Sequence, residues 1–124
     1  PPARAEDEVS ALVSVTPGAT LDRFDAVCEH LSRVHPSKYA RLVDGIPLVG
    51  LTGVHQLTTQ DVALRLVVLV DRLYDNDVPV AAAGESLGAI FSPEMLRGGY
   101  RKKYFRALSR LSALAQLVGD RSRM

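Results

Sequence analysis

Residues 58–84 read TTQDVALRLVVLVDRLYDNDVPVAAAG, and this stretch joins the longest helical pattern of the chain to a short apolar strand. Thr58 or Thr59 can cap a helix that continues to about Asn76, because a threonine hydroxyl accepts a hydrogen bond from the first helical turn. Apolar residues cover most of the circumference of this helix, which predicts a sheet on one side and another layer on the other. The apolar run Val78–Ala83 follows and predicts a buried strand.

The sequence on both sides of this stretch predicts further strands and helices. Before it, we expect a strand over Val9–Val15, a helix from Leu21 to about Val34 capped by Thr20, a strand over Ala40–Val43 and a loop over 50–58. After it, we expect a short helix near Ser86, a helix start at Ser92-Pro93 and a last helix over about Tyr100–Leu117. Alternating strands and helices predict an α/β fold, in which helices flank a short, mostly parallel sheet. We expect a flexible lead-in (1–8), a single α/β domain (9–118) and a basic tail (119–124).

Composition and charge limit the class of protein. The chain has 124 residues, 47% apolar and 23% charged, which is ordinary for a globular domain. The longest apolar run, Leu66–Val70, is far shorter than the roughly 20 residues of a membrane-spanning helix. The net charge of +1 conceals an asymmetry, because residues 1–96 carry seven basic and thirteen acidic side chains, whereas 97–124 carry eight and one. This asymmetry predicts either a cationic face for an anionic partner or charges matched within the domain.

Several kinds of chemical site find no support in the sequence. The three histidines and Cys28 lack metal-ligand spacing, so we expect no metal site and histidines at the surface or in helix caps. Cys28 falls on the apolar stripe of its predicted helix, so we expect it in the core. Gly45 and Gly50 have the glycine spacing of a phosphate-binding P-loop, but Leu51 stands where that motif requires lysine. We therefore expect no complete nucleotide-hydrolysis site and no activity from this chain alone. The sequence begins without methionine, and we interpret it as a piece of a longer polypeptide.

The strongest local feature is the basic segment over residues 101–111, RKKYFRALSRL. On a helix, Tyr104, Leu108, Leu111, Ala115 and Val118 would form one apolar stripe. Arg106 and Arg110 would share another face, where two like charges four residues apart repel each other. An anionic partner would offset this repulsion, and the planar guanidinium group suits phosphate. Arg106 and Arg110 are therefore candidates for binding a nucleotide phosphate, and two solvated arginines are the alternative.

Five segments together resemble one protein family. RALSRL at 106–111 is similar to the R-T-x-S-R-L segment near the C-terminus of ZapE-like P-loop ATPases, which comprise a bacterial cell-division ATPase and its mitochondrial relatives. Arg65 with LVDRLYD at 69–75 resembles R-F-I-x-L-I-D-x-L-Y-D, and Phe24 with Cys28 resembles F-x-x-L-C. VDGIPL at 43–48 is similar to the family's strand ending in (I/V)-P-x-L, and the segment from 78 to 91 resembles the following strand and short helix. Ala107 and Leu114 depart from the family's threonine and methionine, as expected of a divergent member.

The resemblance covers about residues 20–115 and implies the C-terminal part of an AAA-type, P-loop NTPase-like ATPase. It implies that ATP and Mg²⁺ bind in an upstream P-loop domain of the same polypeptide, which this chain would close over. A homo-oligomer, a division-ring or membrane-associated protein partner and a bacterial cytoplasmic location are also implied. Two other functions stay open, a nucleic-acid-binding module and a protein-binding module, each using the basic C-terminal helix. Nucleic acid is the less favoured partner, because the helix lacks a recognised docking motif.

Overall fold

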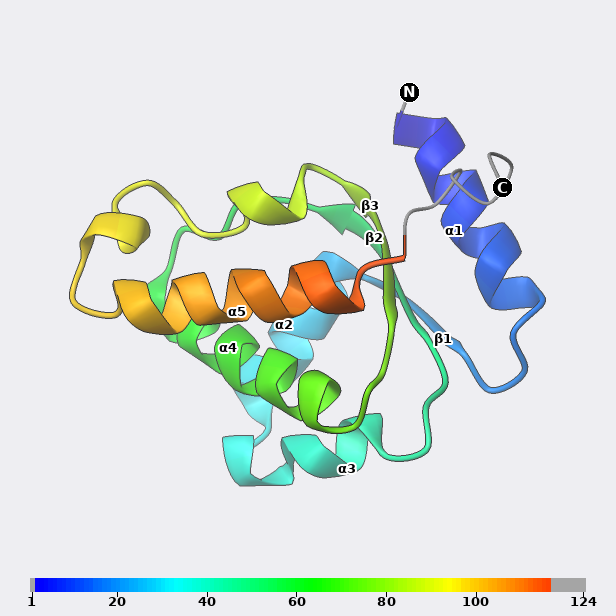
Figure 1. The fold of residues 1–124 in the computed structure, drawn as a ribbon, viewed down its shortest axis with the longest axis horizontal. Coiled ribbons are helices and arrows are strands. Elements are labelled where there is room, and N and C mark those ends of the chain that lie inside the picture. The colour runs from blue at the N-terminus through cyan, green and yellow to red at the C-terminus, as the bar shows by residue number, and fades with distance from the viewer. Residues whose placement is uncertain (1, 117–124) are drawn as a thin grey trace.

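The computed structural model describes residues 2–116 of the chain, which form an α/β fold (Figure 1). A three-stranded sheet is flanked by helices on both faces. The α-helices and strands are, in chain order, α1 (Pro2–Ser14), β1 (Thr20–Arg23), α2 (Phe24–Arg33), α3 (Tyr39–Val43), β2 (Val49–Val54), α4 (Gln60–Asp75), β3 (Val80–Gly84) and α5 (Arg101–Leu114). Short 3-10 helices lie at Pro36–Lys38, Leu87–Ala89 and Met95–Arg97.

The sheet is parallel throughout and has the order β1-β2-β3. Thr20 pairs with Val49 and Val49 with Val80, so the three strands begin at the same level. Beyond β3, Ala115 bridges to Val80, and the Gln116 N–H donates to the Val80 carbonyl at 2.7 Å. The end of the described chain therefore covers the outer side of β3 at its beginning. The expected α/β class and parallel sheet are confirmed.

The core is divided by the sheet into two unequal parts. On one face, α2, α4 and α5 bury the larger cluster, which includes Phe24, Leu66, Val70 and Tyr104. On the other face, α1 packs alone over a small cluster of Val9, Leu48, Ala81 and Ala83. Glycine at position 50 lets α1 lie close to β2, because a Cβ there would meet a Val13 methyl at 2.7 Å.

The N-terminal third of the fold corrects several of the predictions. The strand expected over 9–15 is wrong, because Ala5, Val9, Leu12 and Val13 recur at helical spacing and pack against the sheet from α1. Residues 2–8, expected to be a lead-in, form the first part of the same helix. The expected basic tail lies outside the described residues.

The predicted start of α2 is also wrong, whereas its predicted end near Val34 is confirmed, because Val34 is the C-cap. Thr20 begins β1 instead of capping a helix, and α2 starts at Phe24 after an Arg23 N-cap that makes no side-chain bond. A strand of only four residues, with the exposure pattern of an edge, carries little periodicity to distinguish it from a helix start.

Between residues 39 and 58, the prediction placed a strand where the chain forms a helix and a loop where it forms a strand. Tyr39–Val43 is the short helix α3, not a strand, and the expected loop at 50–58 contains the central strand β2. The two glycines of β2 made it read as a loop, although Gly50 is required for the contact with α1. Residues 43–48, which resemble the family's strand in sequence, therefore form no strand and instead connect α3 to β2. Val54, the last residue of β2, and Leu57 beyond it have the same V-x-x-L spacing, with His55 where the family has proline.

The predictions for the second half are confirmed with small shifts. The helix expected from Thr58 or Thr59 to Asn76 is α4, and the strand expected at 78–83 is β3. Thr59 is the N-cap residue of α4, but its hydroxyl makes no cap hydrogen bond, so the predicted threonine cap is wrong in this respect. The Ser86 hydroxyl accepts from the Gly88 N–H, and the Ser92 hydroxyl accepts from the Met95 N–H. Ser86 is the N-cap of the 3-10 helix Leu87–Ala89. The helix start expected at Ser92-Pro93 lies later, because the 3-10 helix there begins at Met95 with Glu94 as its N-cap.

Candidate functional site

The basic segment lies on α5, which packs along α4 on one face of the sheet (Figure 1). Its inward side is formed by Tyr104, Ala107, Leu111 and Leu114, and the Tyr104 ring stacks on Phe91 with 4.6 Å between centroids. Burial raises the pKa of the Tyr104 hydroxyl. Tyr104, Leu111 and the partly buried Leu108 thus confirm part of the predicted apolar stripe. Ala115 does not belong to it, because α5 ends at Leu114, and Val118 lies outside the described residues.

Arg106 and Arg110 meet at one carboxylate of α4. The Arg110 guanidinium donates to the Asp71 carboxylate at 2.6 Å, and the Arg106 guanidinium approaches its other oxygen at 3.4 Å. The Asp71 side chain is only 14% exposed, whereas that of Arg106 is 53% exposed. The Arg110 guanidinium also lies over the Tyr74 ring, 4.8 Å from its centroid. Asp71 therefore brings the two sequence-predicted site residues together.

This arrangement changes the electrostatic interpretation of the pair. One carboxylate between two guanidinium groups offsets their mutual repulsion within the domain, so an external anion is not needed for that purpose. The three groups still carry a net charge of +1. Arg110 is held by the short ion pair and by Tyr74, while Arg106 has a long contact and an exposed guanidinium. Of the two arginines, Arg106 is the better placed to reach an anion outside this chain.

The first turn of α5 carries a second cationic feature, here called the basic patch: Tyr100, Arg101, Lys102, Lys103 and Phe105. The three cations lie at the positive end of the helix dipole, where acidic side chains are favoured, and the turn contains no acid. The N-cap Tyr100 makes no side-chain cap bond, and Phe105 is 52% exposed. Local electrostatics and hydration both disfavour this arrangement.

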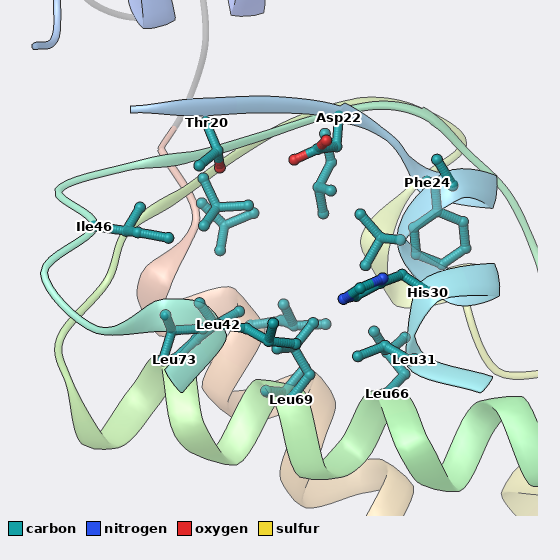
Figure 2. Close-up of a pocket in the computed structure, with 18 of the residues that line it drawn as sticks. Thr20, Asp22, Phe24, His30, Leu31, Leu42, Ile46, Leu66, Leu69 and Leu73 are labelled. Carbon is teal, nitrogen blue, oxygen red and sulfur yellow. The ribbon is translucent and has the colours of Figure 1, made fainter. Parts of the chain in front are cut away.

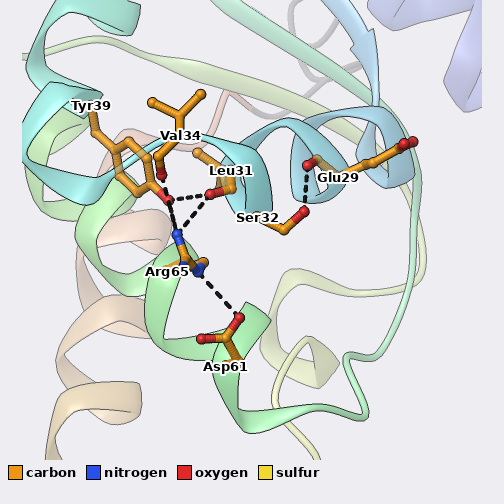
Figure 3. Close-up of polar contacts among 7 residues, drawn as sticks. All are labelled: Glu29, Leu31, Ser32, Val34, Tyr39, Asp61 and Arg65. Carbon is orange, nitrogen blue, oxygen red and sulfur yellow. Dashed lines mark hydrogen bonds and ion pairs between the residues drawn. The ribbon is translucent and has the colours of Figure 1, made fainter.

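Arg65 of α4 has a role that the sequence analysis did not identify, although the residue is part of the family motif. Its guanidinium donates to the carbonyls of Leu31 and Val34 at 3.0 and 3.1 Å, and to Asp61 at 3.2 Å (Figure 3). The buried Tyr39 hydroxyl donates to the same Leu31 carbonyl at 2.6 Å. Hydrogen bonds with Tyr39 and Asp61 raise the pKa of Arg65. Arg65 thus satisfies the C-terminal carbonyls of α2, at the end of the helix where a cation is favoured.

Another pair that the sequence analysis missed lies at the carboxyl ends of the strands. Asp25 follows β1 and His55 follows β2, and the Asp25 carboxylate accepts a hydrogen bond from the His55 imidazole. This bond, a contact with the Gln56 carbonyl and the nearby charges raise the pKa of His55. The two residues are 30 positions apart, so only the pairing of β1 with β2 brings them together.

Cys28 and the histidines take the places expected of structural residues. Cys28 is buried in the larger core cluster, and burial raises the pKa of its thiol to about 11. The His35 ring accepts from the Ser37 N–H and opens a 3-10 turn. Among residues 2–116, no three histidine, cysteine or acidic side chains gather in a way that could hold a metal ion. Within the same residues, no helix is both long and apolar enough to span a membrane.

The glycine pair with P-loop spacing has the wrong structural context for that motif. Gly45 follows α3 and Gly50 lies in β2, so the chain passes from a helix into a strand. In a P-loop, the strand comes first and the helix follows, which directs backbone N–H groups and the helix N-terminus at the phosphates. The segment 45–50 is therefore a connection and not a phosphate cradle.

Comparison with known proteins identifies the family. A family model described as AFG1-like ATPase matches residues 5–120, which is nearly the whole chain and extends beyond the 20–115 covered by the sequence resemblance. No curated protein and no solved structure matches the chain. The α/β architecture with a parallel sheet agrees with an ATPase-related domain. The chain belongs to the AFG1-like ATPase family.

Proposed function

We propose that this chain is the C-terminal part of a ZapE-type ATPase and contributes Arg106 and Arg110 to a nucleotide held by a P-loop elsewhere in the polypeptide. One observation carries the proposal. The ATPase family model covers residues 5–120, yet the sequence contains no G-x-x-x-x-G-K-[ST] motif. The groups that cradle phosphate in such enzymes must then come from another segment. ATP and Mg²⁺ would bind there, and not to this chain alone.

The geometry of the arginine pair supports a division of roles. Arg110 is anchored by Asp71 and Tyr74 and would position its neighbour. Arg106 exposes its guanidinium on the same face, with a 3.4 Å contact that an anion could replace. Phosphoryl transfer depends on positioned cations that neutralise charge on the transferred phosphate, and one such arginine can be worth about 10³–10⁵ in rate. Whether Arg106 would act within one subunit or across a subunit boundary depends on the oligomer.

Turnover and nucleotide binding in the full-length polypeptide test this proposal. Arg106→Ala should lower kcat by about 10³-fold or more while leaving ATP affinity within a few-fold. Arg106→Lys should restore little, because a point charge lacks the planar fork. Arg41→Ala, which removes an exposed cation from α3, is the matched control and should hydrolyse ATP normally. Unchanged turnover in Arg106→Ala and Arg110→Ala, or a coding sequence with no upstream P-loop, would refute the assignment.

The basic patch favours a second function, a docking surface for an anionic macromolecule. Its cations lie at an unfavourable helix end beside an exposed Phe105. The ZapE resemblance supports a protein partner at the division ring or on a membrane-associated protein, with a homo-oligomer in the bacterial cytoplasm. Changing residues 101–103 to glutamine should abolish co-purification of that partner. Retention of the unmodified chain on heparin, falling steeply with salt, would instead indicate nucleic acid.

A further inference from the structure

A pocket of about 490 Å³ opens between β1, α2, α3 and α4, and its lining includes neither Arg106 nor Arg110 (Figure 2). Its volume falls within the range of sites that bind small organic molecules, about 300–1,000 Å³. Leu66, Leu69 and Leu73 of α4 form its floor, and Leu42 and Ile46 close one side. This part of the pocket is entirely aliphatic.

The strand above the pocket, β1, contributes polar side chains to a mainly apolar lining. Side chains alternate along a strand, and Leu21 lies on the α1 side, where it and Val13 would contact a Cβ at position 50. Thr20 and Asp22 therefore point to the opposite side, into the pocket (Figure 2). A position that faces a helix layer is normally apolar, and polar residues at such positions are typical of functional sites.

The charges around the pocket leave one carboxylate without a partner. At the mouth, Glu29 and Arg33 form an ion pair at 3.3 Å and so compensate each other. His30 projects into the pocket from α2 (Figure 2). Among residues 2–116, no ion pair or side-chain hydrogen bond forms at Asp22 or His30. The pocket therefore has an aliphatic floor and an uncompensated carboxylate, Asp22, at its upper side.

We propose that this pocket binds an amphipathic organic cation, with an apolar body on the α4 leucines and an ammonium or guanidinium group beneath Asp22. The apolar body would remove from water the partly exposed surface of Leu42 and Leu69, at roughly 25 cal/mol per Å². The cation would pair with the exposed Asp22 carboxylate, a contact worth up to about five-fold in affinity. A free amine and a lysine side chain of a peptide carry the same chemistry. The site is separate from Arg106 and does not depend on the proposed ATPase role.

The test compares three probes that share one apolar body. In titrations followed by amide NMR shifts, 4-phenylbutylamine should bind this chain more tightly than 4-phenylbutanol, and 4-phenylbutyrate should bind most weakly. The shifts should centre on β1, α2 and α4. Asp22→Asn should weaken binding of the amine about five-fold without affecting the alcohol. Glu94→Gln removes a negative charge from the turn before α5 and is the matched control, which should leave both affinities unchanged.

The outcomes distinguish the proposal from its alternatives. If the alcohol binds as tightly as the amine, or if Asp22→Asn and Glu94→Gln behave alike, the pocket is a nonspecific apolar cleft and the proposal fails. A short peptide, acetyl-Leu-Leu-Lys-amide, distinguishes the two possible sources of the cation, a lysine side chain of a protein and a free amine. Tighter binding of the peptide than of the amine indicates a protein side chain as the ligand, and the reverse indicates a small amine. If neither binds, the proposal is overturned.

Discussion

Replacing Asp71 by asparagine tests whether the arginine pair is neutralised inside the domain. The substitution keeps the shape of the side chain but removes its charge, and it leaves Arg106 and Arg110 facing each other. Asp71 is 14% exposed and Arg110 is 28% exposed, so their 2.6 Å ion pair is partly shielded from water. We expect Asp71→Asn to lower the free energy of unfolding by about 2 kcal/mol.

The magnitude has three parts. Loss of the charged hydrogen bond with Arg110 contributes about 1–2 kcal/mol. The long contact with the half-exposed Arg106 contributes at most about 0.5 kcal/mol, as exposed pairs do. The uncompensated repulsion between two cations four residues apart on α5 adds about 0.2–0.5 kcal/mol. For a domain of this size, 2 kcal/mol corresponds to a decrease in Tm of about 8 °C.

Urea denaturation of the wild type, Asp71→Asn, Arg110→Ala and the double variant measures the effect. The double-mutant cycle should give a coupling energy of about 1 kcal/mol or more between Asp71 and Arg110. Arg4→Ala is the control, because its pair with Glu8 lies on the surface of α1 and should contribute little. A change below 0.5 kcal/mol for Asp71→Asn, or a coupling energy near zero, would refute the conclusion that Asp71 neutralises the pair.

Three further predictions concern other parts of the fold. The pKa of His55 is raised above 6.5 by Asp25, so the pair stabilises the fold below that pH, and this contribution is lost as the pH rises through the raised value. NMR titration should show a lower His55 pKa in Asp25→Asn, and an unchanged value would contradict the assigned cause. Cys28, with a thiol pKa near 11 against the usual 9.0, should react with iodoacetamide at pH 8 about a hundred-fold more slowly than a free cysteine, and more slowly still because it is buried. Equal rates would show that the thiol is accessible and ordinary. Gly50→Val should destabilise the domain by about 1–3 kcal/mol in urea, because its Cβ would lie 2.7 Å from the Val13 methyl, and Val13→Ala should recover part of this loss. Wild-type stability of Gly50→Val would mean that α1 does not pack against β2 as described.

The second half of the fold could be predicted from the sequence because its signals are long. α4 presents four turns of apolar periodicity, and β3 is an uninterrupted run of small apolar residues. The first half was predicted less well. The helix α2 was predicted except for its start, whereas α1 was missed despite its 13 residues, because Val9–Val15 alternates apolar and polar side chains as a strand does. The remaining elements are short or contain glycine. Four residues in β1 and five in α3 are too few for a period to emerge, and the glycines of β2 indicate a turn unless the position of α1 is known.

The candidate site shows the same limit. Spacing on one helix predicted correctly that Arg106 and Arg110 share a face. It did not predict their contact with Asp71, which lies on α4, 35 residues before Arg106. Likewise, the sequence identifies Arg65 as a residue of the family motif, but the carbonyls that it satisfies belong to α2. Contacts between distant segments depend on tertiary packing, and no pattern within a single segment reports them.

The bridge from Ala115 to Val80 makes the sheet asymmetric. Exposed strand edges are templates for adding another strand, and proteins cover those that must not grow. Here the β3 side is occupied where it begins, whereas no strand within residues 2–116 pairs with the far side of β1. A strand contributed from elsewhere in the polypeptide, or by a binding protein, would therefore find the full length of the β1 edge open within these residues, next to Leu21, whereas the β3 edge is blocked at Val80.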